Sequence, residues 1–172
     1  MKYFRVLRYI AYVIELLVVF ILQQTPGLMP TIYGILPTLL LPAVFAVAIF
    51  ERPVCALFYG VFTGFLLDYG SGSVFGFHAL ILGLICFLIS FLVQDLFHNN
   101  FLTAMIMLTI ASVLVLLLQW LFLYLPGGVD SAVYALYRHY LPRIAYTVVW
   151  SPLFYYFNRS FAYLLRGERI KR

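Results

Sequence analysis

Six long apolar stretches, separated by short polar or Gly/Pro-rich breaks, make up most of this chain of 172 residues. They cover residues 9–22, 32–50, 54–68, 75–93, 101–125 and 140–165. A helix needs about 20 apolar residues to cross the ~30 Å hydrocarbon layer of a membrane, and most of the stretches approach that length. The pattern predicts an all-α polytopic integral membrane protein with about six transmembrane helices. We expect residues 1–172 to form a single transmembrane domain.

The composition also favours a membrane protein. Hydrophobic residues make up 65% of the chain and charged residues only 10%, whereas roughly 25% of the residues of a soluble domain are charged. The net charge of +5 does not indicate a nucleic-acid partner, because the basic residues gather near the two ends of the chain. The first stretch lacks a small-residue cleavage site, so we interpret it as a retained helix and not as a signal peptide.

The distribution of basic residues predicts the orientation. If the N-terminus is cytoplasmic, nine of the eleven Lys and Arg residues lie on the cytoplasmic side, and only Arg138 and Arg143 lie outside. Positively charged loops favour the cytoplasmic side of a membrane. Six crossings then place both termini in the cytoplasm.

The third stretch carries one acid, Asp68, on a face of small residues. Ala56, Gly60, Gly64 and Asp68 recur every four residues and therefore share one side of a helix. An ionisable group at the centre of a membrane helix costs about 2.5–3.5 kcal/mol on insertion scales, so it is a functional-site candidate. Small residues at this spacing let another helix approach closely. We therefore predict a docking or packing surface.

The small residues continue beyond this helix. We define the small-residue face as Ala56, Gly60, Gly64, Asp68, Gly72, Gly76 and Ala79. Plain helix packing is an alternative to partner binding for these positions. Asp68 itself could cap the outer turn by accepting backbone N–H groups of Gly70 and Gly72.

A transport or proton-relay site would need several converging polar groups. The sequence offers only His78, Arg138, His139 and Arg143 as neighbours for Asp68. Glu15, the other intramembrane acid, is expected to pair with a cation or to reach the interface by snorkelling; a coupling-ion site is the alternative.

Several remaining features have structural interpretations. Pro37, Pro42 and Pro152 lie inside apolar stretches, where we expect kinks. Cys55 and Cys86 are expected to be small buried apolar residues. The sequence contains no nucleophile–base–orienter set, no H-E-x-x-H motif and no paired carboxylates, so we expect neither an enzyme nor a cofactor or metal site.

Residues 60–80 resemble the signature of the MreD family of rod shape-determining membrane proteins. The matching positions are Gly60, Gly64, Asp68, Ser71-Gly72-Ser73, Gly76 and Ala79-Leu80. The basic N-terminus, the proline in the second stretch and the Trp150-Ser151-Pro152-Leu153-Phe154-Tyr155 segment of the last stretch are also similar.

This resemblance implies a non-enzymatic membrane scaffold of the bacterial cell-elongation (rod) complex, located in the cytoplasmic membrane. Family members work with the single-span protein MreC, the actin-like MreB, and the glycosyltransferase and transpeptidase that build side-wall peptidoglycan. The implied fold is similar to that of the substrate-binding subunits of energy-coupling-factor transporters. Those subunits tend to have an Ala-x-x-x-Ala face on the first helix, whereas this chain has Ala11 and then Glu15. A vitamin-binding subunit is therefore the alternative function. The residues leave open whether the chain forms a homo-oligomer and whether it binds a small ligand or a specific lipid.

Overall fold

All the regular secondary structure in the described part of the chain is helical. The computed structural model describes residues 2–25, 27, 36–71, 75–95, 101–124, 134 and 136–166, and none of these forms a strand. The helices are α1 (Lys2–Gln24), α2 (Leu40–Phe50), α3 (Pro53–Ser71), α4 (Phe77–Asp95), α5 (Phe101–Tyr124), the short π-helix η2 (Leu136–Tyr140) and α7 (Leu141–Arg166). The all-α prediction is confirmed for these residues.

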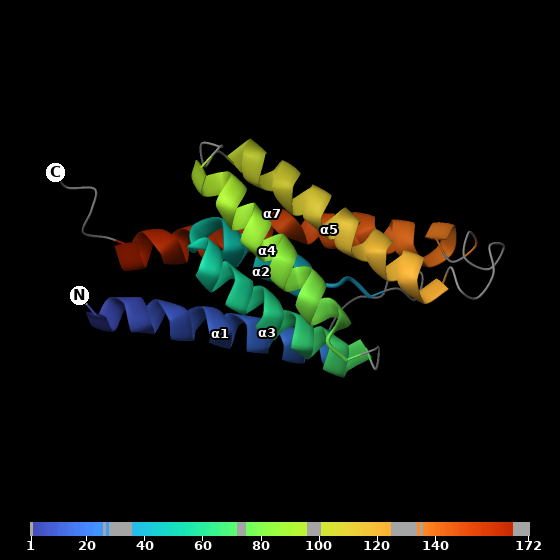
Figure 1. Cartoon of the computed structure of the whole chain (residues 1–172), viewed down its shortest axis with the longest axis horizontal. Coiled ribbons are helices and arrows are strands. Elements are labelled where there is room, and N and C mark those ends of the chain that lie inside the picture. Colours follow the sequence, from blue (N-terminus) through green and yellow to red (C-terminus); the bar gives the residue numbers. More distant parts are fainter. Residues whose placement is uncertain are drawn as a thin grey trace.

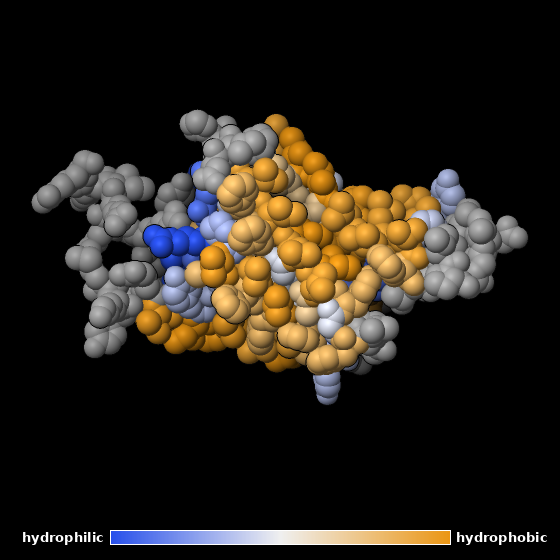
Figure 2. Space-filling model, in the orientation of Figure 1, coloured by the Kyte–Doolittle hydropathy of each residue, from blue (hydrophilic) through white to orange (hydrophobic). Residues whose placement is uncertain are grey.

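Four of the described helices are long and apolar enough to cross a membrane. These segments are Val6–Gln24, Pro53–Gly70, Phe77–Gln94 and Phe101–Phe122. Helix α2 is shorter, with 11 residues, and α7 is longer, with 26 residues, but less apolar. Apolar side chains cover most of the described surface in view in Figure 2. Phe58, Leu80 and Leu102 are each more than 60% exposed, which suits a surface that faces lipid. The chain is therefore a membrane protein, and the number of six crossings stays a prediction.

Helix α2 is the centre of the bundle. All eleven of its residues are buried, and it contacts α1, α3, α4, α5 and α7. Its sequence is apolar on every side, as expected for a helix that is enclosed by other helices. At its start, the Leu40 N–H donates to the Gln23 side-chain oxygen of α1 at 3.2 Å.

The predicted start of this second helix was wrong. We expected a helix from residue 32, but residues 36–38 are not helical and the helix begins at Leu40; residues 32–35 lie outside the described residues. Pro37 therefore precedes the helix and does not kink it. A proline disfavours the helical conformation of the residue before it, which explains the later start. Pro42 lies in the first turn, where a missing N–H is tolerated.

The other helices are arranged around α2 in two groups. Helices α3 and α4 form the most closely packed pair, with α1 beside α3, while α5 packs against α7 (Figure 1). The start of α1 and the end of α7 lie at the same end of the bundle (Figure 1). The bounds of these five helices agree with the predicted stretches to within a few residues, except at the start of α1.

Candidate functional site

The glycines of the small-residue face allow α3 and α4 to touch along their backbones. A Cβ atom at Gly60 would lie 2.5 Å from the Leu82 carbonyl oxygen and 2.9 Å from the Gly83 Cα. A Cβ atom at Gly64 would overlap the backbone of His78 and Ala79. Only glycine fits at these two positions without a backbone shift. The helix that fills this part of the face is therefore α4 of the same chain.

The carboxylate of Asp68 caps the start of α4. It is 1% exposed; Oδ2 accepts the N–H of Gly76 at 2.8 Å and that of Ala79 at 3.4 Å. The other oxygen, Oδ1, accepts the N–H of His78 at 3.1 Å. The first N–H groups of a helix have no partner within the helix, and a side-chain oxygen satisfies them. The donors thus come from the start of α4; Gly72, an expected donor, lies outside the described residues.

The side chain of His78 completes this cap. Its Nδ1 lies 2.7 Å from Asp68 Oδ1, with the histidine 3% exposed, and its ring meets the Phe77 ring edge-on at 5.2 Å. A neutral imidazole forms a hydrogen bond here, and a protonated one forms an ion pair. The sequence had named His78 as a neighbour of Asp68, and the structure brings the two together.

Gly76 has a conformational role. Its φ angle is +97°, a region that side chains rarely adopt, and no atom lies within 4 Å of the position of a Cβ. This glycine therefore sits in the turn before α4 because of its backbone conformation, not because of close packing. Ala56 and Ala79, by contrast, are both buried within the bundle.

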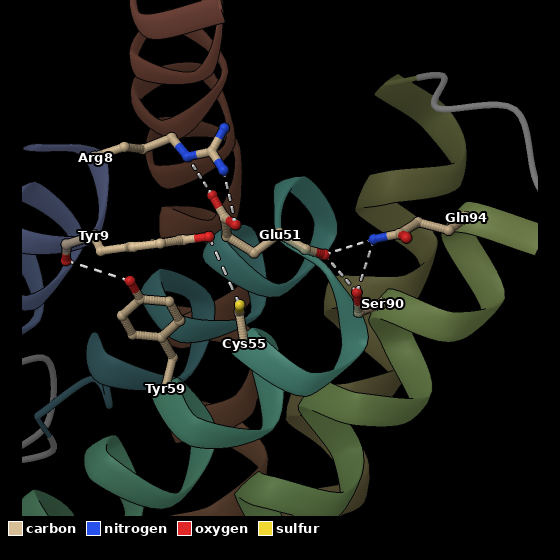
Figure 3. Close-up of polar contacts among 7 residues, drawn as sticks. All are labelled: Arg8, Tyr9, Glu51, Cys55, Tyr59, Ser90 and Gln94. Atoms are coloured by element: carbon tan, nitrogen blue, oxygen red, sulfur yellow. Dashed lines mark hydrogen bonds and ion pairs between the residues drawn. The ribbon is translucent and has the colours of Figure 1, made fainter. Parts of the chain in front are cut away.

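A second polar cluster lies near the start of α1, and we call it the Glu51 junction. It contains Arg8, Tyr9, Glu51, Cys55, Tyr59, Ser90 and Gln94 (Figure 3). Arg8 binds the Glu51 carboxylate with two nitrogens, Nε at 2.6 Å and Nη2 at 3.1 Å. The Glu51 side chain is only 1% exposed, and that of Arg8 is 14% exposed. A hydrogen bond between charged groups, such as that from Arg8 Nη2, is stronger than one between neutral groups.

The backbone of Glu51 extends this cluster to α4. Its carbonyl oxygen accepts the Ser90 hydroxyl at 2.5 Å and the Gln94 side-chain amide at 2.7 Å (Figure 3). On the other side, the Tyr59 hydroxyl donates to the Tyr9 carbonyl oxygen at 3.3 Å. The Glu51 junction therefore ties α1, the end of α2, α3 and α4 together.

Glu51 lies in the break between the second and third apolar stretches, and the sequence analysis did not predict this cluster. The signal that could have revealed it is the position of Glu51, a single acid directly after eleven apolar residues. An acid enclosed on one side by an apolar helix needs a cation or donors nearby. Its partner, Arg8, lies 43 residues earlier.

Within the described residues, the partner of Glu15 is a neutral amide. The Asn158 Nδ2 of α7 donates to Glu15 Oε1 at 2.7 Å and to the Phe154 carbonyl oxygen at 3.1 Å. Asn158 is fully buried. This hydrogen bond joins α1 to α7, and pairing with a cation or snorkelling stays a prediction for Glu15. Pro152 lies inside α7, six residues before Asn158.

Arg143 contacts the segment before α2. Its Nε donates to the Thr38 hydroxyl at 2.7 Å, and the Thr38 N–H donates to the Thr147 hydroxyl at 3.2 Å. Of the four neighbours expected for Asp68, Arg138 and His139 are exposed, and the described contact with Asp68 is that of His78.

No group of three or more His, Cys, Asp or Glu side chains is placed to hold a metal ion within the described ranges. Cys55 and Cys86 are both free thiols, and Cys86 is buried. The polar groups described above link helices to one another.

Together, the helical fold, the exposed apolar surface and the acidic side chains that bond to groups of the same chain define an integral membrane protein. The family model of the rod shape-determining protein MreD matches residues 4–163 of the chain, so the chain belongs to the MreD family. Comparison with curated proteins and with solved structures gave no match. The family assignment confirms the resemblance seen over residues 60–80 and supports a role in determining rod shape.

Proposed function

We propose that this chain is a non-enzymatic scaffold subunit of the bacterial cell-elongation complex. The observation that carries the proposal is the MreD family match over residues 4–163. The described acids support a scaffold, because Asp68, Glu51 and Glu15 all bond to groups of the same chain. In this proposal the chain partners an MreC-like single-span protein. Through the complex it acts with the actin-like MreB and with the wall-building glycosyltransferase and transpeptidase.

The proposed location is the bacterial cytoplasmic membrane, with one transmembrane domain, six crossings and both termini in the cytoplasm. Two features support this topology. The start of α1 and the end of α7 lie at the same end of the bundle (Figure 1). Helix α7 has 26 residues, and at 1.5 Å per residue it is about 39 Å long, more than the hydrocarbon layer requires. Helix α2 would cross as a short, protein-enclosed segment.

The small-residue face contributes to assembly indirectly in this proposal. Because the backbone of α4 packs directly against Gly60 and Gly64, the small-residue face holds α3 and α4 together as one rigid unit. Partner binding then depends on the outer surface of that pair, and a variant that separates the two helices weakens it.

Vitamin binding gains no support from the family match. The cavity described in the next subsection has about 160 Å³, whereas sites that enclose a drug-sized molecule have roughly 300–1,000 Å³. A vitamin would not be enclosed by it.

The test is replacement of the resident MreD protein in a rod-shaped bacterium, combined with recovery of the MreC-like partner from mild detergent. We expect rods and partner recovery with the native sequence. We expect rounded cells and weak recovery with Gly64→Leu, and a near-native result with the matched control Gly83→Ala. Rounded cells and no partner with the native sequence, despite normal membrane levels, would contradict the proposal.

A further inference from the structure

A cavity of about 160 Å³ opens at the end of the bundle opposite the start of α1. It lies where α1 and α3 end and where α4 and α7 begin. Its polar lining residues are Gln23, Gln24, Thr38, His78, Gln119 and Arg143. Gln23 accepts the Leu40 N–H, but none of the interactions described above involves Gln24 or Gln119, which border the same space.

The depth of the cavity matches the level of lipid headgroups. Gln24 and Gly70 are exposed at its edge, and they are the last residues of two segments able to cross a membrane. The ends of such segments lie at the boundary between hydrocarbon and headgroups. Thr38 and His78 are buried and form the inner part of the lining. The cavity therefore opens at the boundary and extends into the bundle.

The charge of the lining favours an anion. Arg143 is half-buried and is held beside the cavity by its 2.7 Å bond to Thr38. None of the described lining residues is itself a carboxylate, and the Asp68 carboxylate next to His78 already accepts N–H groups from the start of α4. The planar guanidinium of arginine binds phosphate oxygens well, and it is less strongly hydrated than an ammonium group. Glutamine amides add neutral N–H donors that can be shared with the same oxygens.

The rest of the lining is apolar, with Phe20, Leu41 and Leu67 among its members. A purely soluble anion would gain nothing from these side chains, whereas the glycerol and first methylene groups of a lipid would. The volume suits a phosphate-sized group with a short apolar extension. We propose that this cavity binds the phosphate group of an anionic phospholipid, with Arg143 as the main contact. A soluble phosphate ester shares this chemistry, and the experiment separates the two sources.

The experiment uses the purified intact chain in mild detergent and native mass spectrometry. Short-chain phosphatidylglycerol is the probe. Diacylglycerol with the same chains lacks the phosphate, and glycerol phosphate lacks the chains. We expect phosphatidylglycerol to bind, diacylglycerol to bind at least tenfold more weakly, and glycerol phosphate to bind weakly. Loss of a hydrogen bond to a charged group corresponds to roughly tenfold or more in affinity, so Arg143→Gln should weaken phosphatidylglycerol binding by about that factor.

Two variants guard against a folding artefact. Arg143→Lys keeps the charge and should retain more binding than Arg143→Gln. Arg138→Gln removes an exposed cation near the start of the same helix and should bind like the native chain. If Arg143→Gln does not fold, Gln119→Leu provides a second change in the lining, with an expected severalfold loss.

The outcomes are distinct. Tight binding of glycerol phosphate, lost in Arg143→Gln, would support the anion site and assign it to a soluble ligand. Equal binding of phosphatidylglycerol and diacylglycerol would overturn the proposal, as would equal binding to folded Arg143→Gln and to the native chain. The assay uses the chain alone, so it is independent of the proposed role in cell elongation.

Discussion

The Nδ1 atom of His78 lies 2.7 Å from the Oδ1 atom of Asp68, and the same carboxylate accepts backbone N–H groups from the first residues of α4. The acid that most suggests a functional site in the sequence is thus the cap that joins the end of α3 to the start of α4. In a region with little water, the first N–H groups of an uncapped helix would have no acceptor. The carboxylate of Asp68 supplies that acceptor, so it fixes how the two helices meet.

Replacing Asp68 should destabilise this junction. Asp68→Ala leaves the N–H groups of Gly76, His78 and Ala79 without their acceptor, and we expect a loss of about 2–4 kcal/mol in the free energy of unfolding. Asp68→Asn keeps one acceptor oxygen and should lose less. Reversible unfolding in mixed detergent micelles measures both. Tyr69→Ala, at an exposed neighbouring position, is the control, and an equal loss in that control would argue against the capping role.

The glycine contacts between α3 and α4 make a graded prediction. Gly64→Ala places a methyl group against the backbone of α4, which cannot move without shifting the helix, and overpacking of this kind costs about 1–3 kcal/mol. Gly83→Ala meets the Val61 Cγ2 atom at 2.7 Å, a side-chain contact that a smaller shift relieves than the backbone contact at Gly64. In thermal unfolding, the midpoint temperature of Gly64→Ala should therefore lie well below that of Gly83→Ala. Equal stabilities would show that the two helices are not packed as closely as described.

The ion pair between Arg8 and Glu51 should couple α1 to the end of α2. Removing one member of a buried pair costs about 3–5 kcal/mol because the remaining charge is left without its partner. Arg8→Gln and Glu51→Gln should each approach the lower part of that range, since Arg8 is 14% exposed. The double variant should lose much less than the sum of the two.

The control for this cycle is Arg52→Gln, next to Glu51 in sequence but exposed; a surface change of this kind should alter stability by less than about 0.5 kcal/mol. Unfolding free energies of all four variants provide the measurement. Strictly additive losses for Arg8→Gln and Glu51→Gln would contradict a direct interaction.

The helices were predictable because their signal is local. Each apolar stretch is visible within about 20 consecutive residues, and the described α-helices begin and end within a few residues of the predicted positions, except at the starts of α1 and α2. The late start of α2 depends on Pro37. The effect of Pro37 on the residue before it is also local, but we expected this proline to kink the helix and not to precede it.

The polar contacts were not predictable from local pattern. Arg8 and Glu51 are 43 residues apart, and Glu15 and Asn158 are 143 apart. Which polar group meets which depends on how whole helices pack against α2, and periodicity along one helix does not contain that information. Asp68 and His78 are only ten residues apart, across one connection, which is why His78 could be named in advance.

The orientation of α1 leads to the last prediction. Thr25, just after α1, and Arg52, just before α3, are both exposed. The path from Arg8 to Thr25 along α1 is about 26 Å at 1.5 Å per residue, enough to bring Thr25 close to the opposite surface. Nine of the eleven basic residues lie on the side of Arg8 and Arg52 in the proposed topology, which favours the cytoplasm for that side.

Single cysteines at these positions, in a background with Cys55→Ala and Cys86→Ala, can be labelled with a membrane-impermeant maleimide. In intact spheroplasts we expect labelling of Thr25→Cys, and labelling of Arg52→Cys only after the membrane is permeabilised. Ile14→Cys, at an exposed apolar position in the middle of α1, should remain unlabelled in both conditions because it faces lipid. Labelling of Arg52→Cys from outside together with protection of Thr25→Cys would reverse the proposed orientation. Labelling of both from the same side would show that α1 does not cross the membrane.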